Sequence, residues 1–141
     1  MKHTKNTEYG KFTNSETSKI EVNDMSWGDR HSKIDIREWG NNGKAGRGIR
    51  IYKEELNTFI DILKNVNPTI TNGNIQGSYR PLNANKNTTA DTTIVFTVDN
   101  FNGKSYVDIR VYVDDETTPT QNGIHFPVDK LADFTSILNS I

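Results

Sequence analysis

The chain of 141 residues has no cysteine, which excludes a disulfide framework and any metal site that needs a thiolate. It also lacks long apolar runs, and none approaches the roughly 20 residues that a membrane-crossing helix requires. No apolar segment follows the polar residues 1–6, whereas a secretory signal would need one. These absences predict a cytoplasmic protein that does not enter the membrane.

The motifs that enzymes use to hold phosphate, metal or an acyl group are also missing. The three histidines, His3, His31 and His125, do not stand at the spacing of paired metal ligands, and the sequence has no phosphate-binding loop or nucleophile elbow. The acidic run 114–116 could hold a divalent cation, but such runs are more often solvated loops. We therefore expect a protein without catalytic activity, cofactor or metal ion.

Charge is close to balance, and the formal net charge of −1 does not by itself indicate a nucleic-acid-binding protein. The two parts of the chain differ, however. Residues 1–72 hold 12 Lys and Arg against 10 Asp and Glu, whereas residues 73–141 hold 5 against 8. Any site for a polyanion should therefore be a small cluster of cationic side chains rather than the whole surface, and it should lie mainly in the first half.

What the chain does contain is one sequence pattern that occurs twice. Residues 33–39, KIDIREW, return as residues 106–112, YVDIRVY, at an offset of 73. Residues 48–51, GIRI, return as residues 123–126, GIHF, at an offset of 75. This self-match predicts two copies of one small domain that share a core, because each copy alone is near the lower size limit for a stable fold. The apolar positions Leu56, Phe59, Leu63 and Val66 return in the same way as Leu131, Phe134, Leu138 and Ile141.

Each copy is predicted to contain four strands and one helix. Alternation of apolar and polar residues indicates strands, and apolar residues every three or four positions indicate a helix. The predicted helices cover residues 53–65 and the residues that follow Pro127. The predicted strands cover residues 9–13, 19–23, 33–39 and 49–51 in the first copy and residues 78–82, 93–98, 105–113 and 124–126 in the second.

The fold class that follows is α+β. We expect two repeats, each a curved four-stranded antiparallel sheet followed by one helix. The repeats should pack as an intrachain pseudo-dimer with the helices at the interface, because one sheet covered by one helix leaves apolar helix surface exposed. The expected organisation is a flexible N-terminal arm over residues 1–8, a first repeat over 9–66, a linker over 67–77 and a second repeat over 78–141.

Strand periodicity also places aromatic and cationic side chains on the solvent face of each sheet. Ile34 and Ile36 point into the core, for example, while Arg37 and Trp39 share the opposite face. Exposed rings can stack on unpaired bases and cationic side chains can follow the phosphates, which favours single-stranded nucleic acid with little sequence preference. The alternative is that the rings cap the core and the arginines pair with neighbouring carboxylates. The candidate binding residues are Trp27, Lys33, Arg37, Trp39, Lys44, Arg47 and Arg50 in the first half and Phe101, Lys104, Tyr106, Arg110, Tyr112 and His125 in the second.

The second half, from Val98 to Lys104, through residues 106–112 and on to residues 122–124, closely resembles the positive cofactor four family of single-stranded-DNA-binding transcriptional coactivators. The first half, with SWG at residues 26–28 and the basic loop at residues 43–49, is similar to bacterial and phage relatives of that family. The resemblance covers residues 9–66 and 78–141.

Family members are homodimers whose two curved sheets hold two antiparallel single strands, so the resemblance implies a covalently fused dimer. It implies binding of single-stranded DNA, or of RNA, in phage or bacterial replication, recombination or transcription, in the host cytoplasm if a phage encodes the chain. The family's aromatic residue after the strand arginine falls at Gly40 and Val113, one position beyond Trp39 and Tyr112. The resemblance places the turn aromatic at Trp27 and Phe101, the turn lysine at Lys104, the strand arginine at Arg37 and Arg110, and the loop basic residues at Lys44 and Arg47.

The loop basic residues become Gln121 and Asn122 in the second half, close to the acidic run 114–116. We therefore expect an asymmetric binder in which the first half contributes more. The alternative function is a protein-interaction module of the same fold, which docks a replication or transcription partner and has lost nucleic acid from its groove.

Overall fold

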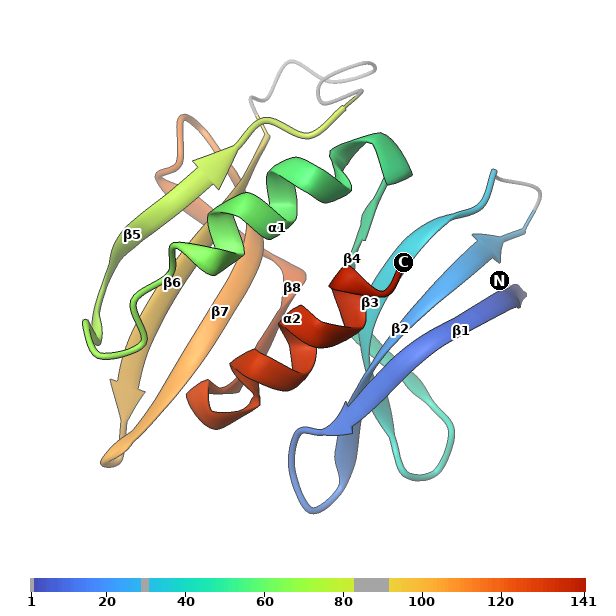
Figure 1. Cartoon of the computed structure of the whole chain (residues 1–141), viewed down its shortest axis with the longest axis horizontal. Helices are drawn as coiled ribbons and strands as arrows, with labels where there is room; N and C mark the ends of the chain where they lie inside the picture. The colour runs from blue at the N-terminus through green and yellow to red at the C-terminus, as the bar shows by residue number, and fades with distance from the viewer. Residues whose placement is uncertain (1, 29–30, 83–91) are drawn as a thin grey trace.

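The computed structural model describes residues 2–28, 31–82 and 92–141, which form two antiparallel sheets and two helices (Figure 1). Each sheet has four strands in sequential order and is followed by a short 3-10 turn and a helix. The predicted two-repeat α+β fold is confirmed. Sheet A contains β1 (His3–Thr13), β2 (Ser18–Trp27), β3 (Lys33–Gly40) and β4 (Ala45–Ile51), followed by η1 (Lys53–Glu55) and α1 (Leu56–Lys64). Sheet B contains β5 (Asn72–Tyr79), β6 (Thr93–Phe101), β7 (Lys104–Val113) and β8 (Thr118–Pro127), followed by η2 (Val128–Lys130) and α2 (Leu131–Asn139).

Two segments differ from the sequence prediction. Residues 3–8, for which a flexible arm was expected, belong to β1 and pair with β2, where the Lys5 Nζ atom lies 2.8 Å from a Glu21 carboxylate oxygen. The first strand of sheet B spans Asn72–Tyr79 rather than residues 78–82, so it begins within the expected linker. Both segments are polar, and their apolar and polar residues do not alternate regularly. Each is an edge strand with only one neighbouring strand, and an edge strand tolerates polar residues.

The hydrophobic core lies between the two sheets, where α1 and α2 run side by side (Figure 1). Alternate residues of the central strands, such as Ile36 in β3 and Ile109 in β7, are completely buried on the face that meets the helices. Phe59 of α1 and Phe134 of α2 contact each other with ring centroids 6.2 Å apart. The two halves therefore share one core. Among the residues described here, no helix has the length and hydropathy to cross a membrane.

Each helix packs against the first strand of the other sheet, because α1 contacts β5 and α2 contacts β1. Two glycines make this close approach possible. A Cβ atom at Gly10 of β1 would lie 2.8 Å from the Ile137 side chain of α2, and one at Gly77 of β5 would lie 2.5 Å from the Ile62 side chain of α1. The strands β4 and β8 also contact each other. Each half therefore covers part of the other half's sheet.

Candidate nucleic-acid interface

The face of each sheet that is turned away from the helices carries the candidate residues; we call these surfaces face A and face B. Strand register places Asp35 of β3 between Asn23 of β2 and Arg50 of β4 on face A. In sheet B, Asp108 of β7 lies between Thr97 of β6 and His125 of β8. Each face therefore has an aspartate at its centre.

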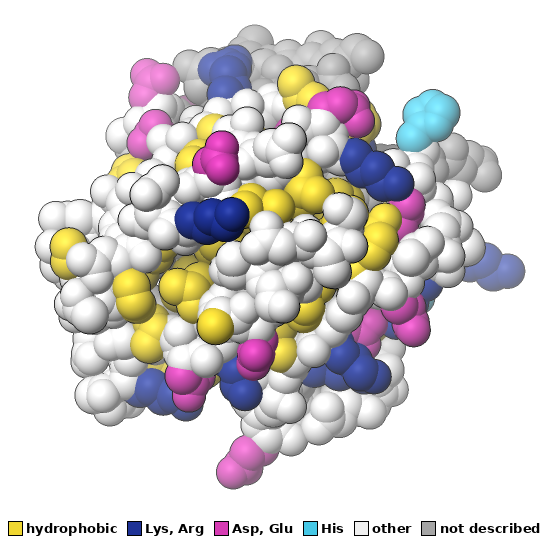
Figure 2. Space-filling view, in the orientation of Figure 1, with side chains coloured by type: hydrophobic (Ala, Val, Ile, Leu, Met, Phe, Trp, Pro, Cys, Tyr) yellow, Lys and Arg dark blue, Asp and Glu magenta, His cyan; other side chains and the backbone are white. Residues whose placement is uncertain are grey.

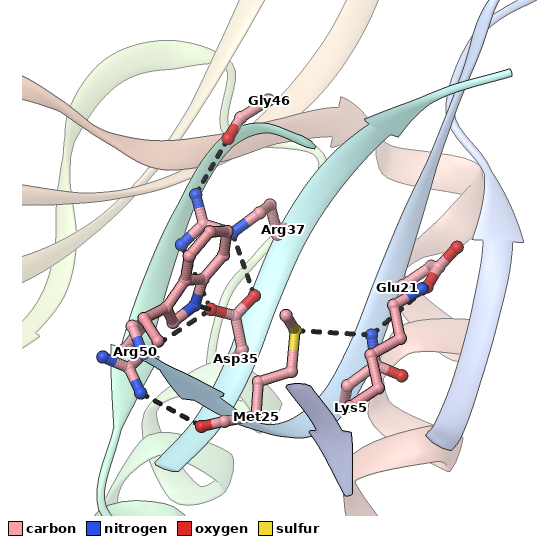
Figure 3. A network of polar contacts seen from close by, with 9 residues as sticks. Lys5, Glu21, Met25, Asp35, Arg37, Gly46 and Arg50 are labelled. Atoms are coloured by element: carbon pink, nitrogen blue, oxygen red, sulfur yellow. Dashed lines mark hydrogen bonds and ion pairs between the residues drawn. The ribbon is translucent and has the colours of Figure 1, made fainter. Parts of the chain in front are cut away.

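On face A, the Asp35 carboxylate is completely buried and organises the groups around it (Figure 3). It accepts hydrogen bonds from the Trp27 indole nitrogen at 3.0 Å and from Arg37 at 3.0 and 3.1 Å. The Arg50 Nε atom lies 3.6 Å from the same carboxylate. A buried carboxylate requires such partners, because an unpaired charge away from water costs several kcal/mol, on the order of 3–5 when a buried pair is broken.

The two arginines of face A also bind backbone carbonyl groups. Arg37 donates a hydrogen bond of 2.8 Å to the Gly46 carbonyl oxygen of β4, and Arg50 donates one of 3.0 Å to the Met25 carbonyl oxygen of β2 (Figure 3). Each guanidinium group is therefore held by both a carboxylate and the backbone. This agrees with the alternative in which the arginines pair with neighbouring carboxylates.

On face A, neighbouring side chains cover the Trp39 ring and partly bury the Trp27 ring. Trp39 is only 3% exposed, and the Lys5 Nζ atom lies 4.3 Å from the centre of its ring. The His3 ring lies 5.2 Å from Trp39 and 5.1 Å from Trp27. The Arg37 guanidinium lies 4.9 Å from the centre of the Trp27 ring. The expectation that Trp39 presents its ring to solvent is wrong, because the N-terminal part of β1 lies across it.

Face B repeats the pairing of aspartate with arginine. Asp108 accepts hydrogen bonds from Arg110 Nε at 3.0 Å and Nη2 at 2.9 Å, and its second oxygen lies 3.1 Å from His125 Nδ1. Arg110 also donates to the Thr120 carbonyl oxygen at 3.1 Å. Burial alone would raise the pKa of Asp108, but hydrogen bonds from His125 and Arg110 outweigh it and hold the pKa below the ordinary value of 3.8. The pairing with Asp108 also raises the pKa of Arg110.

Face B carries one exposed aromatic ring, that of Phe101, and two partly buried rings, those of Tyr106 and His125. Tyr106 and His125 are stacked, with ring centroids 4.6 Å apart and planes inclined by 20°. The Lys104 Nζ atom lies 5.8 Å from the centre of the Tyr106 ring. Phe101 is 67% exposed beside a two-residue turn whose positive φ angles, 53° at Asn102 and 80° at Gly103, fit a tight hairpin. Face B thus offers an exposed ring, a stacked pair and a lysine.

The remaining candidates lie around the two faces. Lys44 lies in the turn between β3 and β4, as the loop pattern predicted, whereas Arg47 belongs to β4; both are exposed. Lys33 lies over the ring of Tyr52, with its Nζ atom 4.3 Å from the ring centre. Tyr112 is partly buried, and burial is the main reason that its pKa is raised. The structure therefore brings Arg37, Arg50 and Trp27 into one network and leaves Lys44 and Arg47 at its rim.

Sequence reasoning missed a cavity at the border of face B. It has a volume of about 440 Å³ and combines three residues of face B with the hairpin between β1 and β2 and with Glu38 of β3 in the first half. No local sequence signal could have revealed it, because the tertiary fold alone brings this hairpin to sheet B. The lining residues are Asn14, Ser15, Glu16, Glu38, Lys104, Tyr106 and His125.

A second hollow, of about 700 Å³, lies between α1 and α2 and is lined by apolar residues that include Leu63, Val66 and Leu131. Figure 2 shows hydrophobic side chains gathered between the two helices on this side of the molecule. Within the parts of the chain that the structure describes, no group of three or more His, Asp or Glu side chains could hold a metal ion.

A comparison with protein families finds a match in the second half of the chain. Residues 89–137 match the family described as Transcriptional Coactivator p15 (PC4), whose members bind single-stranded DNA. The matched range includes β6, β7, β8 and most of α2, so it contains Phe101, Lys104 and Arg110 of face B. A comparison with curated proteins finds no match to the chain.

Proposed function

We propose that the protein binds single-stranded DNA, or RNA, with little sequence specificity and acts in bacterial or phage replication, recombination or transcription within the cytoplasm. It works as a binding protein and not as an enzyme. The observation that carries this proposal is the pairing of an exposed ring with fixed cations on face B, within the residues that match the PC4 family. Face A holds a corresponding ring and arginine, Trp27 and Arg37, but these contact each other and the buried Asp35 carboxylate.

The geometry suits an unpaired strand better than a duplex. Phe101 and Tyr106 can stack on bases only when those bases are unstacked from a partner strand, and each such contact is worth about 1–3 kcal/mol. Lys104 stands beside both rings, where a phosphate of the same strand would pass. Arg110 is fixed by Asp108 and the Thr120 carbonyl group, so its remaining donors meet a phosphate without a loss of side-chain freedom.

The fused arrangement completes the proposal. In our interpretation the chain is a tandem duplication that folds as a pseudo-dimer. The reciprocal contacts of α1 with β5 and of α2 with β1 support this, as do Gly10 and Gly77 at equivalent places beneath Ile137 and Ile62. A chain that already contains both halves needs no second copy to complete its core.

Fluorescence anisotropy with a labelled oligonucleotide of about 20 nucleotides tests the function. We expect saturable binding to the single strand, weak binding to a duplex of the same sequence, and an affinity that falls with salt with a slope of about −0.7 for each neutralised phosphate. Absence of binding at low salt, with the protein shown to be folded by circular dichroism, contradicts the proposal.

A protein-interaction module remains the second candidate, and the apolar hollow between α1 and α2 favours it. The acidic residues 114–116 next to face B also oppose phosphate binding. In that case the oligonucleotide would not bind at any salt concentration, and a replication or transcription protein would bind instead.

A further inference from the structure

The two faces are not equally open, and this difference determines how many strands the protein can hold. We propose that the N-terminal part of β1 closes face A, so that one nucleic-acid strand binds per chain and occupies face B. This inference rests on the proposed function and concerns which surface performs it. It reverses the sequence expectation that the first half contributes more to binding.

On face A, the rings needed for stacking already have partners. Trp27 has the Arg37 guanidinium 4.9 Å from its centre and His3 at 5.1 Å, and its indole nitrogen donates to Asp35. Trp39 is buried beneath Lys5 and His3. A base could reach Trp39 only after the start of β1 had moved away, and the partly buried Trp27 ring offers a base less surface than the exposed Phe101 ring does.

β1 is also held firmly in this position. It pairs with β2 from His3 onward, and Lys5 forms an ion pair of 2.8 Å with Glu21. Burial alone would raise the pKa of Glu21, but hydrogen bonds from Lys5, Asn23 and Lys19 outweigh it and lower the pKa, so the Glu21 carboxylate stays charged at neutral pH. The cover over face A is therefore part of the sheet and not a loose tail.

The cations of face A are similarly engaged. Arg37 and Arg50 share the buried Asp35 carboxylate, and both also donate to backbone carbonyl groups. Arg110 of face B is held in the same way by Asp108 and the Thr120 carbonyl group, so the faces differ in the complete burial of Asp35 and not in the kind of contact that the arginines make. The exposed cations Lys44 and Arg47 lie on the β3–β4 hairpin beyond this network.

Face B offers an open path from the hairpin tip to the border cavity. Phe101 is exposed at the tip, Lys104 follows it across the turn, and the stacked rings of Tyr106 and His125 form one wall of the 440 Å³ cavity. The first half lines the cavity with polar groups that can form hydrogen bonds with a base. Two of them are carboxylates, which favour the donor groups of a base over a phosphate, and Asn14 already donates to one of these carboxylates, that of Glu38. The first-half lining residues are Asn14, Ser15, Glu16 and Glu38. The first half therefore contributes to the single site through its β1–β2 hairpin.

The position of the tryptophans makes the inference testable in the unmodified chain. Both tryptophans of the sequence, Trp27 and Trp39, belong to face A, so their fluorescence reports on that face alone. An oligothymidylate of about ten nucleotides, a length that one single-strand site covers, is titrated while anisotropy and tryptophan emission are recorded together. We expect one oligomer per chain and a change in anisotropy with little change in tryptophan emission.

Substitutions then locate the strand. Phe101→Ala should weaken binding at least about fivefold, the lower end for loss of one stacking ring. Ile70→Ala is the matched control, since Ile70 is also an exposed apolar residue but lies in the loop after α1, and it should leave the affinity unchanged.

The outcomes separate the inference from the function on which it rests. Two oligomers per chain, strong quenching of tryptophan, or an unchanged affinity for Phe101→Ala would overturn the single-strand inference and leave the proposed function standing. No anisotropy change with any oligomer would overturn both.

Discussion

Faces A and B have the same central pair but different surroundings. Asp35 with Arg37 and Asp108 with Arg110 have nearly the same geometry, including the hydrogen bond from each arginine to a carbonyl group of the next strand. Trp39 beside the first pair is buried, whereas Phe101 on the second face is 67% exposed. The comparison teaches that the aspartate–arginine pair is a framework of the sheet. What covers that framework decides whether a ligand can reach it.

The largest difference between the faces should appear when each aspartate is removed. Asp35 is fully buried and has three partners, so Asp35→Ala should lower the free energy of unfolding by about 3–5 kcal/mol, because two arginines lose a buried counter-charge. Asp108 is 15% exposed at its side chain, and Asp108→Ala should cost about 2 kcal/mol. Urea denaturation measures both. Equal losses would contradict the difference in burial, and Asp35→Asn, which keeps an acceptor, should recover part of the loss.

The reciprocal packing of the helices can be tested with the two glycines. Gly77→Ala should destabilise the fold by about 1–3 kcal/mol, because its Cβ atom would overlap Ile62, and Gly10→Ala should do so by a similar or smaller amount against Ile137. Ile62→Ala removes the side chain that the new Cβ atom would overlap, so Gly77→Ala and Ile62→Ala together should cost less stability than the sum of their separate losses. A double-mutant cycle in urea isolates the contact, and additive effects would show that these residues do not meet.

Opening face A should make it resemble face B. The double substitution His3→Ala with Lys5→Ala removes the side chains over Trp39, so tryptophan emission should shift to longer wavelength and become sensitive to added oligonucleotide. The expected loss of stability is about 1 kcal/mol, as the Lys5–Glu21 ion pair is partly exposed. An unchanged spectrum would show that Trp39 is covered by something other than β1. Lys11→Ala, at an exposed position of the same strand, is the control.

The smallest effect concerns acid stability. The folded-state pKa values of Glu21 and Asp108 lie below their ordinary values of 4.5 and 3.8, so both carboxylates stabilise the fold above those values. This contribution is lost as the pH falls through the lower folded-state values, and thermal stability should therefore decrease below about pH 4. Asp108→Asn should flatten this decrease. A profile identical to that of the unmodified chain would contradict the role of Asp108.

Much of the fold could be predicted because the central strands alternate strictly. Ile34 and Ile36, like Val107 and Ile109, can be buried together only on one side of a strand. The alternation therefore predicted which face of each sheet meets the core. The edge strands β1 and β5 were harder to predict, because strands with one neighbour tolerate polar residues and glycine. The pairing of Arg37 with Asp35 was anticipated as an alternative, since residues two apart on a strand share a face.

The accessibility of the candidate site could not be predicted in the same way. Trp39 and Phe101 look alike in sequence, as aromatic residues near the end of a strand, yet one is buried and the other exposed. The difference arises from the position of His3 and Lys5, which depends on the pairing of a strand that shows no periodicity. The border cavity likewise depends on where the β1–β2 hairpin lies relative to sheet B.

Because one polypeptide contains both sheets, a substitution alters a single face. In an assembly of two identical subunits every change would appear twice, and a residue that improved one surface while harming the other could not be retained. The covalent connection through the segment after α1 removes that constraint. His125 can therefore stand where the first half has Arg50, and the two surfaces are free to diverge in chemistry while the helices beneath them keep a common architecture.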